Sequence, residues 1–576
     1  MTFRLYQTII AKTRWLRMLS AIILTCWLQP LPAHAGTSSI PWGNVPCDPP
    51  PTGIPDPGTG QQCAYITVPL DYRKPAGQQI LLAVSIVHAD PGKRRGVLFL
   101  NPGGPGGAGL DMPRLFSFLL SSTLGDAVAQ SVLAQYDLIG FDPRFVGHST
   151  GATCGLTAEQ GDQMFVPLEQ DHSFPATTAF VKTVAADCAR KSGANVLPFA
   201  TTANTARDMD LIRQRLGEDK INYFAWSYGT YLGAVYSSLF PNQGDRIVLD
   251  SNVDPNWVWR QVFREWGAAG AIRWPDFANW AAAHDAEYHF GTTADAVTAL
   301  YFQLYDRADA SPFSDPDLLG DATLVNGPIF RELTFSFLEH DASFPSLAAF
   351  WQTTMSSAGS QGTGTAVRMA VPNRAVAGSG AAASAPLTIP AASTLPTALT
   401  PIPIDNKAAS ATAIICDDAG WSRSVSQYQV EFTSDSEMYP MFGALGSNIY
   451  PCVSWANAPV EQPIPITSNG PRNILLLQNL RDPNTPYSGA QEMHSSLGQR
   501  SVLVSVDQGG HAIFGFETNA CANDAAVAYL RDGVLPDTDV SCAADAVSRV
   551  RNAAPPERQH LVEALVRRFS IFPQLH

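Results

Sequence analysis

The fold of this chain is decided by a short stretch, residues 221–233, which reads INYFAWSYGTYLG. Its first half is apolar and aromatic, as expected of a buried strand in a parallel sheet, and it stops abruptly at Ser227. The residues that follow continue with a helical pattern. A sharp strand-to-helix turn that exposes a serine hydroxyl above a sheet is a nucleophile elbow. The usual pattern is G-x-S-x-G, and Ala225 here replaces the first glycine, so the stretch predicts an elbow with a slightly relaxed turn.

Length and composition set the class of protein. The chain has 576 residues, of which 45% are hydrophobic and 15% charged, as is typical of a globular protein with one enlarged domain or two. The formal net charge of -14 argues against a nucleic-acid partner, which would need a basic face.

Residues 1–35 have the pattern of a signal peptide. A basic beginning precedes an apolar run at 18–28, and residues 33–35, AHA, offer a cleavage site. The apolar run is too short to span a membrane comfortably. We therefore expect export to the periplasm or the extracellular space, with no membrane span after the signal is removed.

The cysteines agree with export. Removing Cys26 with the signal peptide leaves an even number, eight, which suggests disulfides in an exported chain. They fall along the sequence as four neighbouring couples, so we expect sequential pairing: Cys47–Cys63, Cys154–Cys188, Cys416–Cys452 and Cys521–Cys542. A metal site is the weaker interpretation because the sequence contains no C-x-x-C pair.

Strands alternate with helices over much of the chain. Two strands at 65–68 and 80–87 predict an antiparallel start to a sheet. Later strands, separated by helical segments, predict a mostly parallel sheet with helices on both faces. These later strands are expected at 96–100, 136–142, 221–226, 246–250, 473–478 and 501–506.

Between these strands the alternation breaks. Helical segments rich in tryptophan and phenylalanine are followed by residues 356–412, whose Ala, Ser, Gly, Thr and Pro content predicts a long irregular loop. We interpret the interruption as a helical cap inserted into the sheet domain. The predicted divisions are 36–255 and 471–553 for the two parts of the sheet domain, 256–470 for the cap, and 554–576 for a helical tail.

Three residues carry the predicted chemistry. A serine hydroxyl is a weak nucleophile and needs a histidine base that is itself oriented by a carboxylate. Ser227, Asp482 and His511 each follow a predicted strand, so they should meet at the carboxyl edge of the parallel sheet. Their order along the chain is that of the α/β-hydrolases. Asp250 also ends a predicted strand and is the alternative acid.

An acyl-transfer site also needs two backbone N–H groups aimed at the developing oxyanion. One should come from Tyr228, directly after the serine. The other should come from Gly103 or Gly104, in the glycine-rich stretch 101–109, and we favour Gly104.

Taken together, these motifs resemble those of the secreted tripeptidyl-aminopeptidase-like α/β-hydrolases, relatives of the proline iminopeptidases. The resemblance covers most of the mature chain. It implies an α/β-hydrolase fold with a helical cap and a serine peptidase acting on peptides, with no metal or organic cofactor. Ala225 and Phe145 depart from the family pattern, which has glycine at both places. The motifs are NPGGPG at 101–106, GFDPR at 140–144, SYGT at 227–230, RDPNTP at 481–486 and GGH at 509–511.

The expected function is that of an exported aminopeptidase releasing tripeptides or proline-type residues from free N-termini. An esterase or amidase using the same triad is one alternative, and a non-catalytic binding protein on a hydrolase scaffold is another. A free N-terminus is an ammonium ion that needs a carboxylate in a water-poor pocket. Asp417 and Asp418 are the candidates, with Glu265 as a weaker one; the plainer interpretation is that both aspartates cap a turn.

Overall fold

The predicted elbow forms strand β5 (Ile221–Trp226) and helix α7 (Tyr228–Leu239) in the computed structural model. The structure describes residues 39–50, 60–157, 160–161, 175–315, 324–357 and 395–544. The predicted signal peptide, most of the predicted irregular loop and the predicted C-terminal tail lie outside the described residues.

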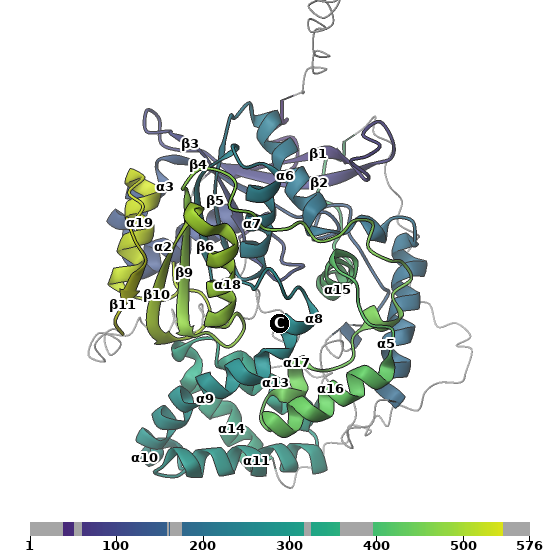
Figure 1. The fold of residues 1–576 in the computed structure, drawn as a ribbon, viewed down its shortest axis with the longest axis vertical. Helices are drawn as coiled ribbons and strands as arrows, with labels where there is room; N and C mark the ends of the chain where they lie inside the picture. Colours follow the sequence, from purple (N-terminus) through teal and green to yellow (C-terminus); the bar gives the residue numbers. More distant parts are fainter. Residues whose placement is uncertain are drawn as a thin grey trace, which may run out of the picture. The chain divides into compact units, whose positions relative to one another are not determined.

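Strand β5 lies at the centre of the main sheet. In the described part of the chain this sheet has nine strands in the order β1-β2-β4-β3-β5-β6-β9-β10-β11. Strand β2 is antiparallel to β1 and β4, and the other pairs are parallel, as predicted (Figure 1). The strands other than β5 are β1 (Gln62–Pro69), β2 (Gln79–Val87), β3 (Gly96–Asn101), β4 (Tyr136–Phe141), β6 (Gly244–Asp250), β9 (Ile474–Arg481), β10 (Ser501–Gly509) and β11 (Val540–Cys542).

Helices cover both faces of the sheet, because successive side chains of a strand point to opposite faces. Phe224 and Trp226 of β5 pack on one face with α2 (Met112–Leu124), α3 (Asp126–Leu133) and α19 (Ala520–Asp532). Tyr223 and Ala225 point to the other face. That face packs against α6 (Thr202–Leu216), α7 and α18 (Tyr487–Leu497) (Figure 1). A strand buried on both sides explains the continuous apolar run in the sequence.

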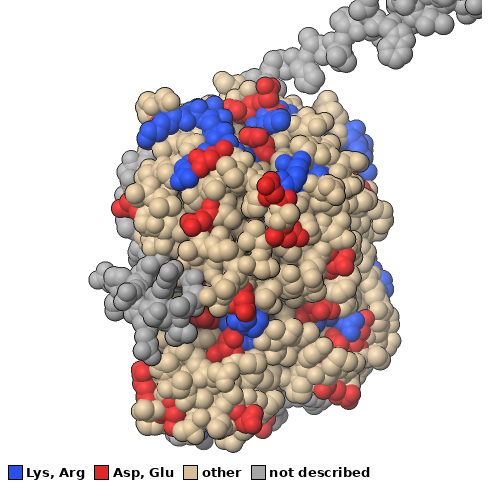
Figure 2. All heavy atoms as spheres, turned by 60° about the vertical axis from the view of Figure 1, so that its left-hand side comes forward, with Lys and Arg blue, Asp and Glu red and all other residues tan. Residues whose placement is uncertain are grey.

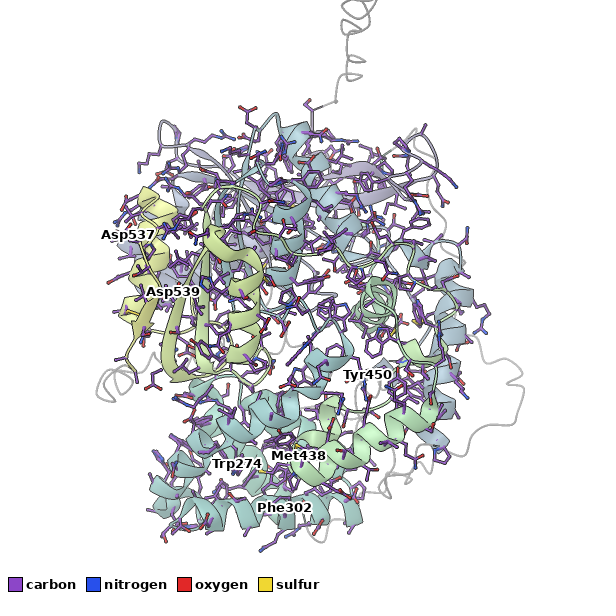
Figure 3. The ribbon with its side chains drawn as sticks, in the orientation of Figure 1. Trp274, Phe302, Met438, Tyr450, Asp537 and Asp539 are labelled. Carbon is purple, nitrogen blue, oxygen red and sulfur yellow. A yellow bond between two sulfur atoms is a disulfide. The ribbon has the colours of Figure 1, made fainter. Side chains whose placement is uncertain are left out.

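A helical insertion separates β6 from β9, as predicted, although these two strands are neighbours in the sheet. Its aromatic side chains mostly form its own core: Trp274, labelled in Figure 3, is buried and stacks on Trp351 with ring centroids 5.9 Å apart. The insertion consists of α8 (Arg260–Arg264), α9 (Trp266–Ala283), α10 (Asp285–Tyr288), α11 (Ala294–Ala310), α13 (Gly327–Phe337), α14 (Phe344–Ser356), α15 (Asn406–Asp418), α16 (Val425–Met438), α17 (Gly443–Gly446) and the short hairpin β7 (Phe313–Ser314) with β8 (Leu324–Val325).

One boundary within the insertion differs from the prediction. Helix α15 begins at Asn406, inside the stretch expected to be irregular up to residue 412. The first turns of α15 are rich in alanine, serine and threonine. Alanine is the best helix former, so a composition that suggests low complexity is here compatible with a buried helix.

The eight cysteines of the described residues form four disulfides with the predicted sequential pairing, Cys47–Cys63, Cys154–Cys188, Cys416–Cys452 and Cys521–Cys542. Another helix of the fold, α5 (Pro175–Cys188), ends at one of these bridges. Within the described ranges, no helix has the length and apolar character needed to cross a membrane. On the face drawn in Figure 2, acidic and basic side chains form small mixed groups among many uncharged residues.

Candidate active site

Ser227 lies on the sharp turn that the sequence predicts. Its backbone has φ 58° and ψ -129°, an unusual conformation for a residue with a side chain, and its N–H donates to the carbonyl oxygen of Asp250 at 3.0 Å. Ala225 is tolerated because residue 229 is glycine: a Cβ added at Gly229 would lie 2.5 Å from the Cβ of Ala225. The tight crossing of strand and helix therefore needs one missing side chain at this point, and Gly229 supplies it.

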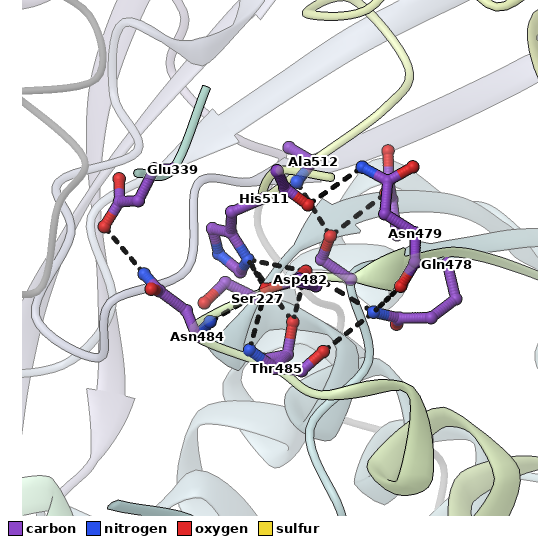
Figure 4. Close-up of polar contacts among 12 residues, drawn as sticks. Ser227, Glu339, Gln478, Asn479, Asp482, Asn484, Thr485, His511 and Ala512 are labelled. Carbon is purple, nitrogen blue, oxygen red and sulfur yellow. Dashed lines mark hydrogen bonds and ion pairs between the residues drawn. The ribbon is translucent and has the colours of Figure 1, made fainter. Parts of the chain in front are cut away.

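His511 and Asp482 form a hydrogen-bonded pair behind this serine. The Nδ1 atom of His511 lies 2.9 and 3.0 Å from the two carboxylate oxygens of Asp482. Asp482 is buried at the end of β9 and also accepts hydrogen bonds from the backbone N–H of Asn484 at 2.9 Å and from the hydroxyl of Thr485 at 2.8 Å. These donors hold the carboxylate in one orientation toward the imidazole (Figure 4).

Burial and charge act in opposite directions on this pair. Burial favours the protonated form of Asp482, but the charge of His511 and its hydrogen bond, with those from Thr485, outweigh burial and lower the pKa of Asp482. Burial likewise favours neutral His511, but Asp482 outweighs it, with further contributions from Glu339 and Asp250, and raises the pKa of His511. The carboxylate is thus placed to stabilise an imidazolium.

Ser227 and His511 line the same cavity, so the structure brings the serine and the Asp482–His511 pair to one place. The cavity has a volume of about 60 Å³. Its walls come from both the sheet domain and the insertion and include six large aromatic side chains, Trp226, Tyr228, Trp259, Phe263, Trp266 and Phe516. Such walls suit apolar or ring-shaped groups of a ligand.

The contacts of Gly103 and Gly104 distinguish these two candidates for the second oxyanion donor. The N–H of Gly103 donates to Asn101 Oδ1 at 3.0 Å, whereas Gly104 lines the cavity together with Tyr228. Gly103 is required by close approach, since an added Cβ would lie 2.6 Å from the carbonyl oxygen of Trp226. This arrangement favours Gly104 and Tyr228 as the two donors.

Asp250, the alternative acid, forms hydrogen bonds with the backbone after His511 and not with the imidazole. Its carboxylate accepts from the backbone N–H groups of Ile513 at 2.9 Å and Phe514 at 2.8 Å, in the loop that follows His511. Burial raises its pKa to about 7 against these hydrogen bonds. Asp250 therefore supports the histidine loop, and Asp482 is the carboxylate that contacts the imidazole.

The two acids predicted to bind the substrate amine do not line the cavity. Asp417 is fully buried and accepts from the indole N–H of Trp455 at 2.9 Å. Asp418 is buried behind the cavity wall, where it accepts from the backbone N–H of Thr202 at 2.6 Å and the indole N–H of Trp259 at 3.2 Å. The prediction for these residues is therefore corrected: neither lines the cavity of Ser227, and Asp418 lines only a separate small pocket beside Thr202 and Tyr231 among the pockets described. Glu265, the weaker candidate, is not among the residues that line this cavity and lines a small neighbouring pocket.

The carboxylate that does line the cavity is Glu339, which sequence reasoning missed. It follows α13 by two residues and is 3% exposed. Asn484 Nδ2 donates to Glu339 Oε1 at 2.7 Å, and the N–H of His511 donates to the backbone carbonyl oxygen of Glu339 at 2.7 Å (Figure 4). No motif marks Glu339; the only signal is its partner Asn484, which lies in the same motif as Asp482.

In the described part of the chain, no lysine, arginine or histidine lies within ion-pair distance of the Glu339 carboxylate. Among the described residues, no donor pairs with its second carboxylate oxygen, Oε2. Burial raises the pKa of Glu339, while the nearby charge of His511 acts in the opposite direction. Within the described ranges, no group of three His, Cys, Asp or Glu side chains could hold a metal ion. A buried carboxylate with one free oxygen can pair with a cationic group that enters the cavity.

The sequence is similar to those of known proteins. The pattern of the family described as "TAP-like protein" matches residues 439–542. The chain is 34% identical over 532 residues to a tripeptidyl aminopeptidase of Streptomyces coelicolor, covering 90% of this chain and 88% of that protein. It is 27% identical to the serine protease Hip1 of Mycobacterium tuberculosis, covering 84% and 87%. It is 30% identical to carboxylesterase B of the same organism, covering 84% and 86%.

Proposed function

The chain belongs to the TAP-like family of α/β-hydrolase serine peptidases, and from this premise we propose that it is an aminopeptidase that cleaves tripeptides or proline-type residues from free peptide N-termini. One observation carries the step from hydrolase to aminopeptidase. A buried carboxylate, Glu339, lines the cavity beside Ser227 and His511.

The geometry supports the following mechanism. Ser227 Oγ attacks the scissile carbonyl carbon as His511 takes its proton, while Asp482 stabilises the imidazolium. The backbone N–H groups of Tyr228 and Gly104 hold the oxyanion of the tetrahedral intermediate. His511 then protonates the departing amine as the C–N bond breaks. Water, activated by His511, hydrolyses the acyl-enzyme and restores the free serine.

Glu339 gives this general mechanism its preference for a free N-terminus. A substrate ammonium next to a buried carboxylate forms a charge-assisted hydrogen bond, worth about 1.5–3 kcal/mol. Asn484 already orients the carboxylate, so little ordering is left for the substrate to induce. An acetylated N-terminus has no positive charge and leaves the carboxylate unpaired, which costs binding energy in the same cavity.

The test compares a peptidyl arylamide that has a free amine with its N-acetylated ester counterpart in the wild-type protein and in Glu339→Gln. We expect Glu339→Gln to lower kcat/KM for the free amine by about 10- to 100-fold and to leave the acetylated ester nearly unchanged. The matched control is Asp417→Asn, a buried acid away from the cavity. Equal losses on both substrates would refute amine recognition by Glu339.

A second candidate function, an esterase or amidase, is favoured by the 30% identity to carboxylesterase B. It uses the same serine, histidine and aspartate and differs only in the acyl donor. The same substrate panel separates the two: turnover of simple aryl esters with no turnover of any free-amine peptide would refute the peptidase and support the esterase.

We also propose that the protein is exported to the periplasm or the extracellular space. The support is the four disulfides, which persist in oxidising compartments, together with the signal-like pattern of residues 1–35. Fractionation of the producing cells, with the protein detected by antibody, tests the location. Recovery only from the reducing cytosol would contradict export.

A further inference from the structure

Asp418 joins three separate parts of the chain at a point behind the cavity wall. It is the last residue of α15 in the helical insertion and is 6% exposed. One oxygen, Oδ1, accepts from the backbone N–H of Thr202 at 2.6 Å, in the first turn of α6. The other, Oδ2, accepts from the hydroxyl of Thr202 at 2.6 Å and from the indole N–H of Trp259 at 3.2 Å.

Thr202 extends this contact to the residue after the nucleophile. Its hydroxyl lies 2.8 Å from the phenolic oxygen of Tyr228. Since the hydroxyl of Thr202 donates to the carboxylate, it is left to accept from the phenol of Tyr228. The chain of hydrogen bonds therefore runs in one direction, from Tyr228 through Thr202 to Asp418.

Both ends of this network form part of the cavity. Tyr228 and Trp259 line it, and their rings pack on one another with centroids 5.7 Å apart. The Trp259 ring also meets Tyr231 edge to face at 5.3 Å. Asp418 itself stays behind these rings and does not touch the cavity.

We propose that Asp418 is a positioning residue that sets the oxyanion hole and one cavity wall together. Through Thr202 it fixes the ring of Tyr228, and hence the backbone N–H of Tyr228 beside Ser227. Directly, it fixes the indole of Trp259. The helical insertion thus contributes to the catalytic geometry of the sheet domain through a residue that contacts no substrate. This inference rests on the proposed roles of Ser227 and Tyr228.

The isosteric change Asp418→Asn shows why a carboxylate is needed. The three hydrogens that point at Asp418 come from two groups of Thr202 and from Trp259. An asparagine presents one oxygen and one NH₂ group. Whichever way its amide is turned, a donor faces a donor, at either the backbone N–H of Thr202 or the indole of Trp259. The network must then loosen at a buried site.

The experiment measures the rate constant with which a small alkyl fluorophosphonate inactivates each protein. In this reaction the Oγ–P bond to Ser227 forms, fluoride leaves, and the serine proton passes to His511, so the rate depends on the triad and the oxyanion hole but not on a peptide. We expect a loss of about 10-fold or more for Asp418→Asn and a similar loss in kcat on an arylamide.

Two comparisons separate positioning from a merely structural role. Asp417→Asn changes the neighbouring buried acid, which accepts a hydrogen bond from Trp455 away from the cavity. This variant should lower the Tm but change the inactivation rate constant by less than about twofold. Thr202→Ser keeps the bridging hydroxyl and should react like the wild type. Thr202→Val removes the hydroxyl at similar volume and should lose as much as Asp418→Asn.

The possible outcomes have distinct meanings. Wild-type inactivation rates in folded Asp418→Asn, or equal rates for Thr202→Ser and Thr202→Val, would overturn the inference and leave the proposed function intact. If Asp418→Asn does not fold, the inactivation rate constants of Thr202→Ser and Thr202→Val alone decide between the two roles. A folded wild-type protein that is not labelled at Ser227 would refute the proposed function and this inference with it.

Discussion

Replacing Asp482 by asparagine tests the central pair of the site most directly. The carboxylate receives hydrogen bonds on both oxygens: Oδ1 from the backbone N–H of Asn484 and of Thr485, each at 2.9 Å, and Oδ2 from the Thr485 hydroxyl at 2.8 Å and from His511 Nδ1 at 2.9 Å. The two backbone donors cannot reverse, so the asparagine oxygen must stay with them. Its NH₂ group then faces Thr485 and His511, whose Nδ1 lies 2.9 Å from the Oδ2 position and 3.0 Å from Oδ1.

The asparagine changes which ring nitrogen of His511 carries the proton. An NH₂ group in place of Oδ2 donates to Nδ1 of His511, so the ring proton moves to Nε2. An imidazole protonated at Nε2 cannot accept the proton of Ser227, and its cation has lost the carboxylate. The expected fall in kcat is about 10⁴-fold, with a stability loss of about 1–3 kcal/mol from the rearranged hydrogen bonds.

Asp250→Asn is the matched control. Ile513 and Phe514 donate most closely to Oδ2 of Asp250, at 2.9 and 2.8 Å, so an asparagine oxygen in that place keeps both bonds, and its NH₂ group disturbs only the longer contacts of Oδ1 with Ile513 at 3.2 Å and Ser251 at 3.5 Å. We expect a change in kcat of less than about tenfold. The assay is kcat on a peptidyl arylamide alongside the thermal unfolding of each variant. Near-full activity of Asp482→Asn, with activity lost in a folded Asp250→Asn, would refute the assignment of the acid.

Two further predictions concern the glycine loop and the pH dependence. Gly103→Ala should abolish measurable kcat, because the added Cβ would lie 2.6 Å from the Trp226 carbonyl oxygen and 3.0 Å from Ser227 Cβ. The control is Gly217→Ala, where φ is also positive but the added Cβ meets no atom within 4 Å; this variant should lose about 1 kcal/mol of stability and no activity. The pH dependence follows from His511: kcat/KM should rise as the pH passes the raised pKa of His511, because only the neutral imidazole accepts the serine proton. Glu339→Gln removes a charge that raises this pKa, so the acid limb should move to lower pH; an unmoved limb would contradict the contact, and Asp417→Asn should leave it in place.

Local patterns in the sequence were sufficient to predict much of the sheet and the proposed triad. A buried parallel strand is apolar along its whole length, and its polar successor falls at the carboxyl edge whatever the distant partners are. This is why Ser227, Asp482 and His511 could be picked out although they come from three strands. The glycine stretch could be located in the same way, but the choice between Gly103 and Gly104 needed the contact with Asn101.

The contribution of the insertion could not be predicted in this way. Asp417 and Asp418 follow an apolar run and a cysteine, much as site residues do, but which side of a helix end faces the cavity depends on packing against Trp259 and Trp455. Glu339 has no such flanking pattern. It reaches the cavity because its backbone carbonyl oxygen accepts from His511, a contact between segments far apart in the sequence.

The pairing of β6 with β9 across the whole insertion, with Ile247 beside Ile474, has a consequence for biosynthesis. The growing chain contains Ser227 long before Asp482 and His511 have been made. Strand β5 can pair with β3 and β6, but β6 lacks its outer neighbour β9 until the later strands have been made, and Ser227 has no partner histidine during that time. If the proposed triad carries the activity, an unfinished or prematurely terminated chain is inert toward the peptides around it, and hydrolysis begins only when Asp482 and His511 have been added and folded.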